Sequence, residues 1–218
     1  MSDLFANPHI SAALYFTNQG HYIFKYKDEH MGVSSKALRT KEVAAAFTLQ
    51  DSDSGWIPSG VMRTGHNAMG DWFIFFAKPL LVDIRFTKEK AITIPAPATV
   101  LLGMNDDYYL FAMGEEDFNP KGKVYSAPFP NVHTDGRICW GSNQKPKVHH
   151  SSASQAWDLF FKSAFNGDLA DHKCKKNPQD VREFLKGLSG ESRFPVSAMY
   201  VCYETLEGLI DQYRKGRK

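Results

Sequence analysis

Residues 127–141 have the sequence APFPNVHTDGRICWG and separate two regions of more regular pattern. The two prolines in the first half of this stretch restrict the backbone, because each ring fixes one dihedral angle. Asp135-Gly136 is a tight-turn pair, since glycine tolerates a positive φ and Asp bonds to nearby backbone. The stretch therefore predicts a rigid reversal of the chain that holds Asn131 and Cys139 close together.

A thiol and an amide side by side suit acyl transfer. The thiolate of a cysteine is a strong nucleophile, and the thioester that it forms stays reactive toward amines. An amide such as that of Asn131 can donate a hydrogen bond to the oxyanion formed during attack, which is commonly worth about 10²–10³ in rate. Most lone cysteines are instead buried and inert, so a structural role for Cys139 is the alternative.

This stretch resembles the active-site signature of the ubiquitin-conjugating enzyme family. That signature is His-Pro-Asn, a hydrophobic residue, a short turn with glycine, then a hydrophobic residue and the catalytic cysteine. Phe129-Pro130-Asn131-Val132 and Gly136-Arg137-Ile138-Cys139 match it, with the same spacing from Asn to Cys. Phe129 replaces the usual His, so we expect aromatic packing to hold the loop in place of hydrogen bonds. Trp140-Gly141-Ser142-Asn143 replaces the usual Leu-Asp pattern after the cysteine.

More narrowly, the stretch looks like the bacterial branch that the PRTRC gene cassette encodes as its system protein B. The resemblance implies a thioester-forming acyltransferase in which Cys139 accepts a small ubiquitin-like protein from a ThiF-like activating enzyme and passes it to an acceptor. Asn131 would then stabilise the oxyanion. A JAB-type peptidase of the same cassette is a further expected partner.

The resemblance also implies three supporting residues. In the family, an acidic residue after the first helix beyond the cysteine assists the attacking amine, and Asp168 and Asp171 both occupy that segment. We favour Asp171, with a solvated loop carboxylate as the alternative. Arg137 and Trp140 are candidates for contact with the carried protein. The alternatives are that Arg137 is an ordinary solvated loop residue and that Trp140 only fills space in the core.

The N-terminal fifty residues predict a hairpin and a helix. Residues 10–16 and 21–26 are β-forming runs on either side of a turn-rich tetrapeptide, which indicates a hairpin. Ser34 or Ser35 is expected to cap a helix that continues to about Phe47.

Between residues 56 and 113, short β-forming runs alternate with Gly, Pro, Asn and Asp, which predicts an antiparallel meander. A loop from about Gly114 to Ser152 follows, and long loops inside compact domains are usually functional or disordered. Apolar residues at helical spacing then predict three helices, over residues 157–165, over 178–188 behind an Asn177 cap, and over 206–213.

These elements predict the α+β class. The expected architecture is a ubiquitin-conjugating enzyme-like fold, with an antiparallel meander sheet, helices packed on one side and an added N-terminal hairpin. We assign residues 1–50 to the N-terminal hairpin and helix elaboration and residues 51–218 to the core, as one continuous domain overall.

Composition argues against several classes of partner. Lys and Arg total 26 against 24 Asp and Glu, so no large basic field attracts nucleic acid or an anionic membrane. The longest apolar run, residues 72–77, is far shorter than the roughly 20 residues that span a bilayer. Three cysteines without a CxxC pair indicate a reducing compartment. We therefore expect a cytoplasmic protein with no nucleic-acid or membrane partner.

No metal or cofactor is expected. His149, His150, His172 and Cys174 are not accompanied by a second pair at zinc-ligand spacing. The chain has no glycine-rich phosphate loop, so activation by ATP must belong to another protein. Two rival functions remain: a noncatalytic module that binds a ubiquitin-like protein, and a Cys-His hydrolase that uses His133.

Overall fold

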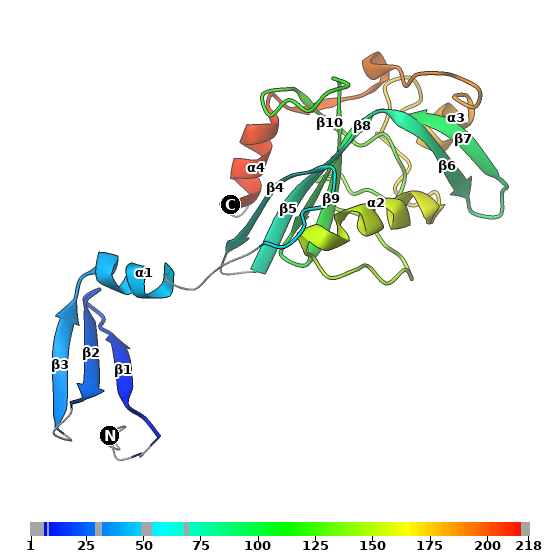
Figure 1. Cartoon of the computed structure of the whole chain (residues 1–218). Helices are drawn as coiled ribbons and strands as arrows, with labels where there is room; N and C mark the ends of the chain where they lie inside the picture. Colours follow the sequence, from blue (N-terminus) through cyan, green and yellow to red (C-terminus); the bar gives the residue numbers. More distant parts are fainter. Residues whose placement is uncertain (1–6, 8, 29–31, 49–53, 68–69, 215–218) are drawn as a thin grey trace. The chain divides into compact units, whose positions relative to one another are not determined.

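The computed structural model describes residues 7, 9–28, 32–48, 54–67 and 70–214 (Figure 1). The chain divides into two compact units, residues 1–55 and residues 56–218, and each is described by itself. Within the described residues, no helix combines the length and the apolar character needed to cross a membrane.

The N-terminal unit is a three-stranded antiparallel sheet followed by a helix. Its elements are β1 (Ala12–Phe16), β2 (Tyr22–Lys27), β3 (Val33–Leu38) and α1 (Thr40–Thr48). The predicted hairpin is present as β1 and β2. The prediction of a helix from Ser34 or Ser35 was wrong, because that segment pairs with β2 along its whole length. The helix starts later, where the Glu42 carboxylate accepts a hydrogen bond from the Arg39 amide (2.8 Å) in the manner of a capping box.

The second unit is built on a six-stranded antiparallel sheet. Its strands lie in the order β12-β10-β9-β8-β5-β4, so that β9 and β8 are central and β4 and β12 form the edges. Their bounds are β4 (Val61–Asn67), β5 (Gly70–Ala77), β8 (Ala98–Met104), β9 (Asp107–Met113), β10 (Val124–Ser126) and β12 (Val201–Tyr203).

The expected simple meander is wrong at one place. β6 (Leu80–Phe86) and β7 (Ala91–Ala96) leave the main sheet and form a hairpin of their own, which the short strand β11 (Ala164–Phe165) joins in parallel with β6. Both sides of β5 are already occupied, by β4 and β8. Pro79 and Pro97 mark the points where the chain leaves and rejoins the main sheet, since proline has no N–H for the ladder.

Helices cover both faces of the main sheet, so the expectation of helices on one side was also wrong (Figure 1). On one face of β5, Phe73 and Phe75 pack in the same hydrophobic cluster as α2 (Ala153–Lys162). On the other face, Trp72, Ile74 and Phe76 pack in the same cluster as α4 (Leu206–Arg214). Strands that are apolar on both faces need cover on both faces. A third helix, α3 (Val181–Lys186), packs beside β7.

Two helix boundaries differ from the predicted ones. α2 ends at Lys162, because Ser163 is extended (φ −71°, ψ 148°) and the next two residues pair with β6. α3 begins at Val181 rather than behind Asn177, because the Asp180 carboxylate caps it by accepting from the Arg182 amide (2.9 Å).

Candidate active site

Residues 131–139 form a tight hairpin. The Cys139 amide donates to the Asn131 carbonyl oxygen (2.7 Å), and Val132 and Ile138 form an antiparallel bridge. The Gly136 amide closes the turn on the His133 carbonyl (2.9 Å). The structure thus places Asn131 and Cys139 opposite one another, as the turn at Asp135-Gly136 predicts.

The hairpin is attached to the main sheet through β9. The Leu110 amide donates to the Gly136 carbonyl (2.8 Å), and the Ile138 amide donates to the Tyr108 carbonyl (2.8 Å). Gly136 has φ +86°, and a Cβ on it would lie 2.3 Å from the Phe111 ring. The turn therefore needs glycine both for its backbone conformation and for its close approach to β9.

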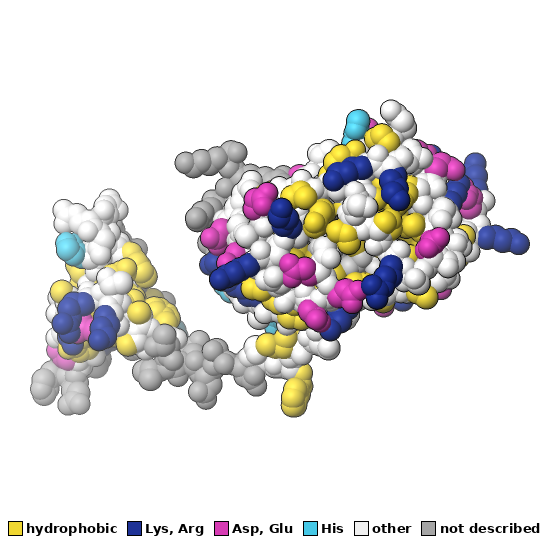
Figure 2. All heavy atoms as spheres, turned by 90° about the horizontal axis from the view of Figure 1, so that it is seen from above, with side chains coloured by type: hydrophobic (Ala, Val, Ile, Leu, Met, Phe, Trp, Pro, Cys, Tyr) yellow, Lys and Arg dark blue, Asp and Glu magenta, His cyan; other side chains and the backbone are white. Residues whose placement is uncertain are grey.

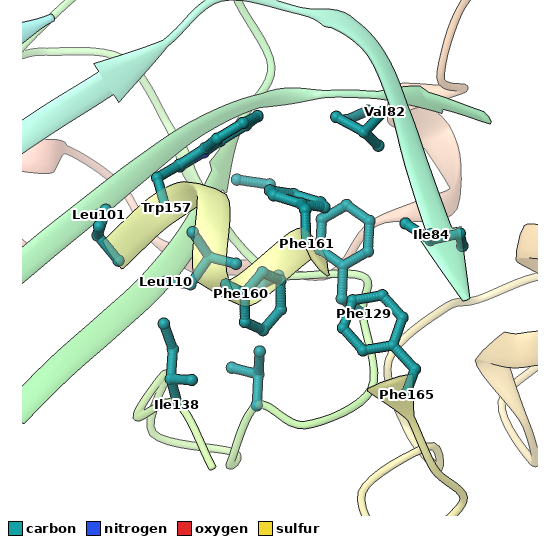
Figure 3. Packing of buried hydrophobic residues seen from close by; sticks show 14 of the residues in the cluster. Val82, Ile84, Leu101, Leu110, Phe129, Ile138, Trp157, Phe160, Phe161 and Phe165 are labelled. Carbon is teal, nitrogen blue, oxygen red and sulfur yellow. The ribbon is translucent and has the colours of Figure 1, made fainter. Parts of the chain in front are cut away.

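Below the hairpin, the ring of Phe129 is fully buried. It meets the rings of Phe160, Phe161 and Phe165 at centroid distances of 6.1, 5.2 and 6.3 Å (Figure 3). The expected aromatic packing in place of a histidine is confirmed. Because these rings come from α2 and β11, the helix after the loop supports the residues just before Asn131.

Asn131 adopts a left-handed backbone (φ +60°) and is only 9% exposed. Its Nδ2 donates to the Ala164 carbonyl (3.1 Å), and its Oδ1 accepts from the Asn166 amide (3.5 Å). Asparagine tolerates this backbone conformation better than most residues do. The side chain therefore ties the hairpin to the segment after α2, and one N–H of its amide is already in use.

The three cysteines differ in accessibility. Cys139 is exposed, whereas Cys174 is completely buried. Cys202 is also exposed as a residue, but its thiol donates to the Val124 carbonyl (3.4 Å), and burial of the sulfur raises its pKa to about 11. Cys139 is thus the exposed thiol that stands beside an asparagine.

Arg137 lies on the same face of the hairpin as Cys139. Both residues are exposed and Ile138 between them is buried, as alternation along a strand requires. Trp140 is half-buried, and its ring meets Tyr108 edge-on at 5.6 Å. Its indole Nε1 is buried and finds no acceptor among the described residues. Trp140 packs on the core and anchors the end of the hairpin.

The two candidate carboxylates have different surroundings. Asn166 donates from Nδ2 to Asp168 (2.9 Å) and accepts from the Asp168 amide (3.1 Å), so a hydrogen-bonded path joins Asn131 to Asp168. Asp171 is exposed, with its carboxylate 3.8 Å from the His172 ring. Asn166 was not among the predicted site residues, because an Asn-Gly pair after an apolar helical stripe indicates only a helix end.

Lys173 is a buried lysine next to the candidate acidic residues, at 5% exposure. Burial lowers its pKa, and the attraction of Asp171 and Asp135 opposes that shift. Asp135 belongs to the hairpin turn, so a positive charge stands between the turn and the segment that carries Asp171.

Among the described residues, no group of three His, Cys, Asp or Glu side chains has the arrangement of a metal site. The histidines proposed and set aside above have other contacts: the rings of His149 and His150 lie 4.0 Å apart, and His149 bonds to Ser151 (2.6 Å).

An open hollow of about 680 Å³ lies between the β6–β7 hairpin and segments 113–117 and 192–196, and none of the predicted site residues lines it. On the face shown in Figure 2, hydrophobic side chains are interspersed with charged side chains of both signs. Neither sign of charge dominates that face.

Comparison with known proteins identifies one family. The model described as prokaryotic E2 family D matches residues 35–200, a range that includes the hairpin and both candidate carboxylates and ends before α4. The comparisons with curated proteins and with solved structures gave no match.

Proposed function

Because this chain belongs to the prokaryotic E2 family D, we propose that it is a ubiquitin-conjugating-like enzyme that carries a ubiquitin-like protein on Cys139 as a thioester. The observation that carries this proposal is the exposed Cys139 thiol, held opposite Asn131 by backbone hydrogen bonds in a hairpin that a buried aromatic cluster supports. A nucleophile on a rigid, exposed turn can meet a large acyl donor without rearrangement.

Two acyl transfers follow from this placement. First, the Cys139 thiolate attacks the C-terminal carbonyl carbon of the ubiquitin-like protein, and the thiolate of the activating enzyme leaves. Then an amine nitrogen of the acceptor attacks the same carbon, and the oxyanion collapses to an amide as Cys139 leaves. The proton of the amine passes to a base. A ThiF-like enzyme would supply the first thioester, and a JAB-type peptidase would cleave conjugates.

Asn131 is proposed to stabilise the oxyanion of the second step. One N–H of its amide is occupied by Ala164, and the other is the donor that this role requires. The same side chain thus serves as a brace in the resting protein and as a donor during aminolysis.

One of Asp168 and Asp171 is proposed to assist the attacking amine. The path through Asn166 supports Asp168, whereas Asp171 lies beside His172. Asp168→Asn and Asp171→Asn, compared in the discharge of a preformed thioester to lysine, decide between them: the variant that slows discharge identifies the residue. Arg137, exposed on the face of Cys139, is proposed to contact the C-terminal tail of the carried protein, and Trp140 to shape the wall beside it.

The proposal is tested by incubating the chain with ATP, a ThiF-like activating enzyme and a small ubiquitin-like protein. An adduct that thiol reductant removes should form on Cys139. Cys139→Ser should give a reductant-resistant oxyester instead, because an alkoxide leaves less readily than a thiolate. Cys202→Ser is the matched control and should load normally. Binding without any adduct would favour the noncatalytic module, and an adduct unchanged by Cys139→Ser would exclude this cysteine.

A further inference from the structure

We propose that Tyr213 of the C-terminal helix α4 is a positioning residue for the active-site hairpin, an inference that rests on the proposed function. The Tyr213 hydroxyl donates to the backbone carbonyl of Asp135 at 2.5 Å. Asp135 lies in the turn between the strands that end at Asn131 and Cys139. The family match ends at residue 200, so this support comes from outside the matched region.

Tyr213 is itself firmly placed. It is 7% exposed, and its ring meets Tyr109 at 4.7 Å and Phe111 at 6.1 Å, both edge-on. Leu206, Leu209 and Ile210 of the same helix are buried in the cluster on that face of the sheet. The hydroxyl therefore approaches the turn from a fixed element, and α4 cannot shift without uncovering the sheet.

The turn packs on the same ring that Tyr213 packs on. Gly136 lies so close to Phe111 that a Cβ would collide with the ring, and Tyr213 contacts Phe111 from α4. On its other side, the Asp135 carboxylate accepts from the Arg137 amide (3.0 Å). The Asp135 peptide is thus held at both its side chain and its carbonyl, and the hydroxyl of Tyr213 sets the position of the carbonyl.

The hydrogen bond between Tyr213 and Asp135 affects the placement of Asn131 and Cys139 through the short, hydrogen-bonded hairpin that joins them. The turn determines how the two strands of the hairpin align, and the Cys139 amide bonds to Asn131 at their far end. Without the hydrogen bond from α4, fewer contacts fix the relative position of the two strands. Because small displacements of a catalytic group reduce rates strongly, loss of the hydroxyl should slow transfer more than it affects the fold.

Tyr213→Phe tests this inference, since it keeps the ring and removes the hydroxyl. Tyr203→Phe is the matched control, because Tyr203 of β12 also packs edge-on against Phe111, at 6.2 Å. Both are made in a Cys202→Ser background. Cys139 is loaded from a mercaptoethanesulfonate thioester of a glycine-ended peptide: the Cys139 thiolate attacks the peptide carbonyl, mercaptoethanesulfonate leaves, and lysine then discharges the adduct. No activating enzyme is needed.

Tyr213→Phe should lower the maximal discharge rate about threefold to tenfold, the range expected for one net hydrogen bond. The lysine concentration at half-maximal rate should not change. Amide hydrogen exchange over residues 131–139, measured without any partner, should accelerate by a similar factor. Tyr203→Phe should change neither quantity.

The positioning role would be overturned if Tyr213→Phe had the same discharge and exchange rates as the wild-type chain, or if Tyr203→Phe had an equal defect. Failure of the wild-type chain to load at Cys139, or discharge no faster than that of a free glutathione thioester, would overturn the proposed function instead. In that case the exchange measurement still decides whether Tyr213 holds the turn.

Discussion

The backbone amide of Cys139 donates to the carbonyl oxygen of Asn131 at 2.7 Å, so the proposed nucleophile and the proposed oxyanion donor close the same hairpin. The Asn131 side chain points toward the segment after α2, where its Nδ2 donates to the Ala164 carbonyl. Asn131 therefore has a structural contact that any substitution removes, and its proposed catalytic contribution must be measured separately from that contact.

Asn131→Gly should slow discharge of the thioester by about 10²–10³ and leave loading largely intact. Glycine keeps the left-handed backbone, so the change removes the amide without straining the turn. Loading uses an already good nucleophile, whereas aminolysis builds the oxyanion that needs a donor. Single-turnover loading and a lysine chase measure the two steps.

Asn143→Ala is the control for lost bracing, because the Asn143 amide also makes two hydrogen bonds: Nδ2 donates to the Trp140 carbonyl (3.0 Å) and to the Ser163 hydroxyl (3.1 Å). Each variant loses two side-chain hydrogen bonds, so Asn143→Ala and Asn131→Gly should each lower the free energy of unfolding by about 1–2 kcal/mol. In Asn143→Ala, however, the discharge rate should stay within about threefold of the wild-type rate. Equal discharge defects in the two variants would assign Asn131 a bracing role alone.

Gly136→Ala should lower the free energy of unfolding by about 2–4 kcal/mol and slow discharge. The alanine Cβ must displace the Phe111 ring, in addition to the cost of a left-handed backbone. Gly190 has the same positive φ (+87°) but open space around its Cβ position, so Gly190→Ala should cost only about 1 kcal/mol. Urea unfolding of both variants gives the difference, and equal costs would contradict the tight packing of the turn.

Phe129→His, which restores the residue usual in ubiquitin-conjugating enzymes, should destabilise this chain by about 2–4 kcal/mol, more than Phe129→Leu. The site is apolar and fully buried, so an imidazole N–H would lose its hydration without a partner. Burial lowers the folded-state pKa of such a histidine, so the unfolded chain binds the proton first and the deficit should grow as the pH falls below about 6.5. Unfolding curves at several pH values measure both effects, and a histidine tolerated like leucine would contradict the described packing.

Iodoacetamide at neutral pH should modify Cys139 well before Cys202 and Cys174. Burial raises the pKa of the Cys202 thiol to about 11, so its reactive thiolate is scarce and its labelling rate should rise with pH up to that value. Cys174 is completely buried and should react only on unfolding. Peptide mass spectrometry follows each site, and a Cys202 that reacts as fast as Cys139 at neutral pH would refute this order.

Features that depend on near neighbours could be predicted from the sequence. A turn pair between two short strands was enough to bring Asn131 and Cys139 together, and the apolar stripes of α2 and α4 were visible in their spacing. Local turn chemistry and helical periodicity act over a few residues, so they can be followed along the chain. The family resemblance came from the same local stretch, and residues 35–200 match that family.

Which segments meet across long separations became clear from the fold alone. The fold gave β2 a second partner strand, β3, where a helix was expected, moved β6 and β7 out of the main sheet, and placed α4 on the face opposite α2. The same holds for the site: Asn131 meets Ala164 across 33 residues, and Tyr213 meets Asp135 across 78. Such contacts depend on which apolar faces compete for burial, and periodicity shows that a face is apolar without showing what covers it.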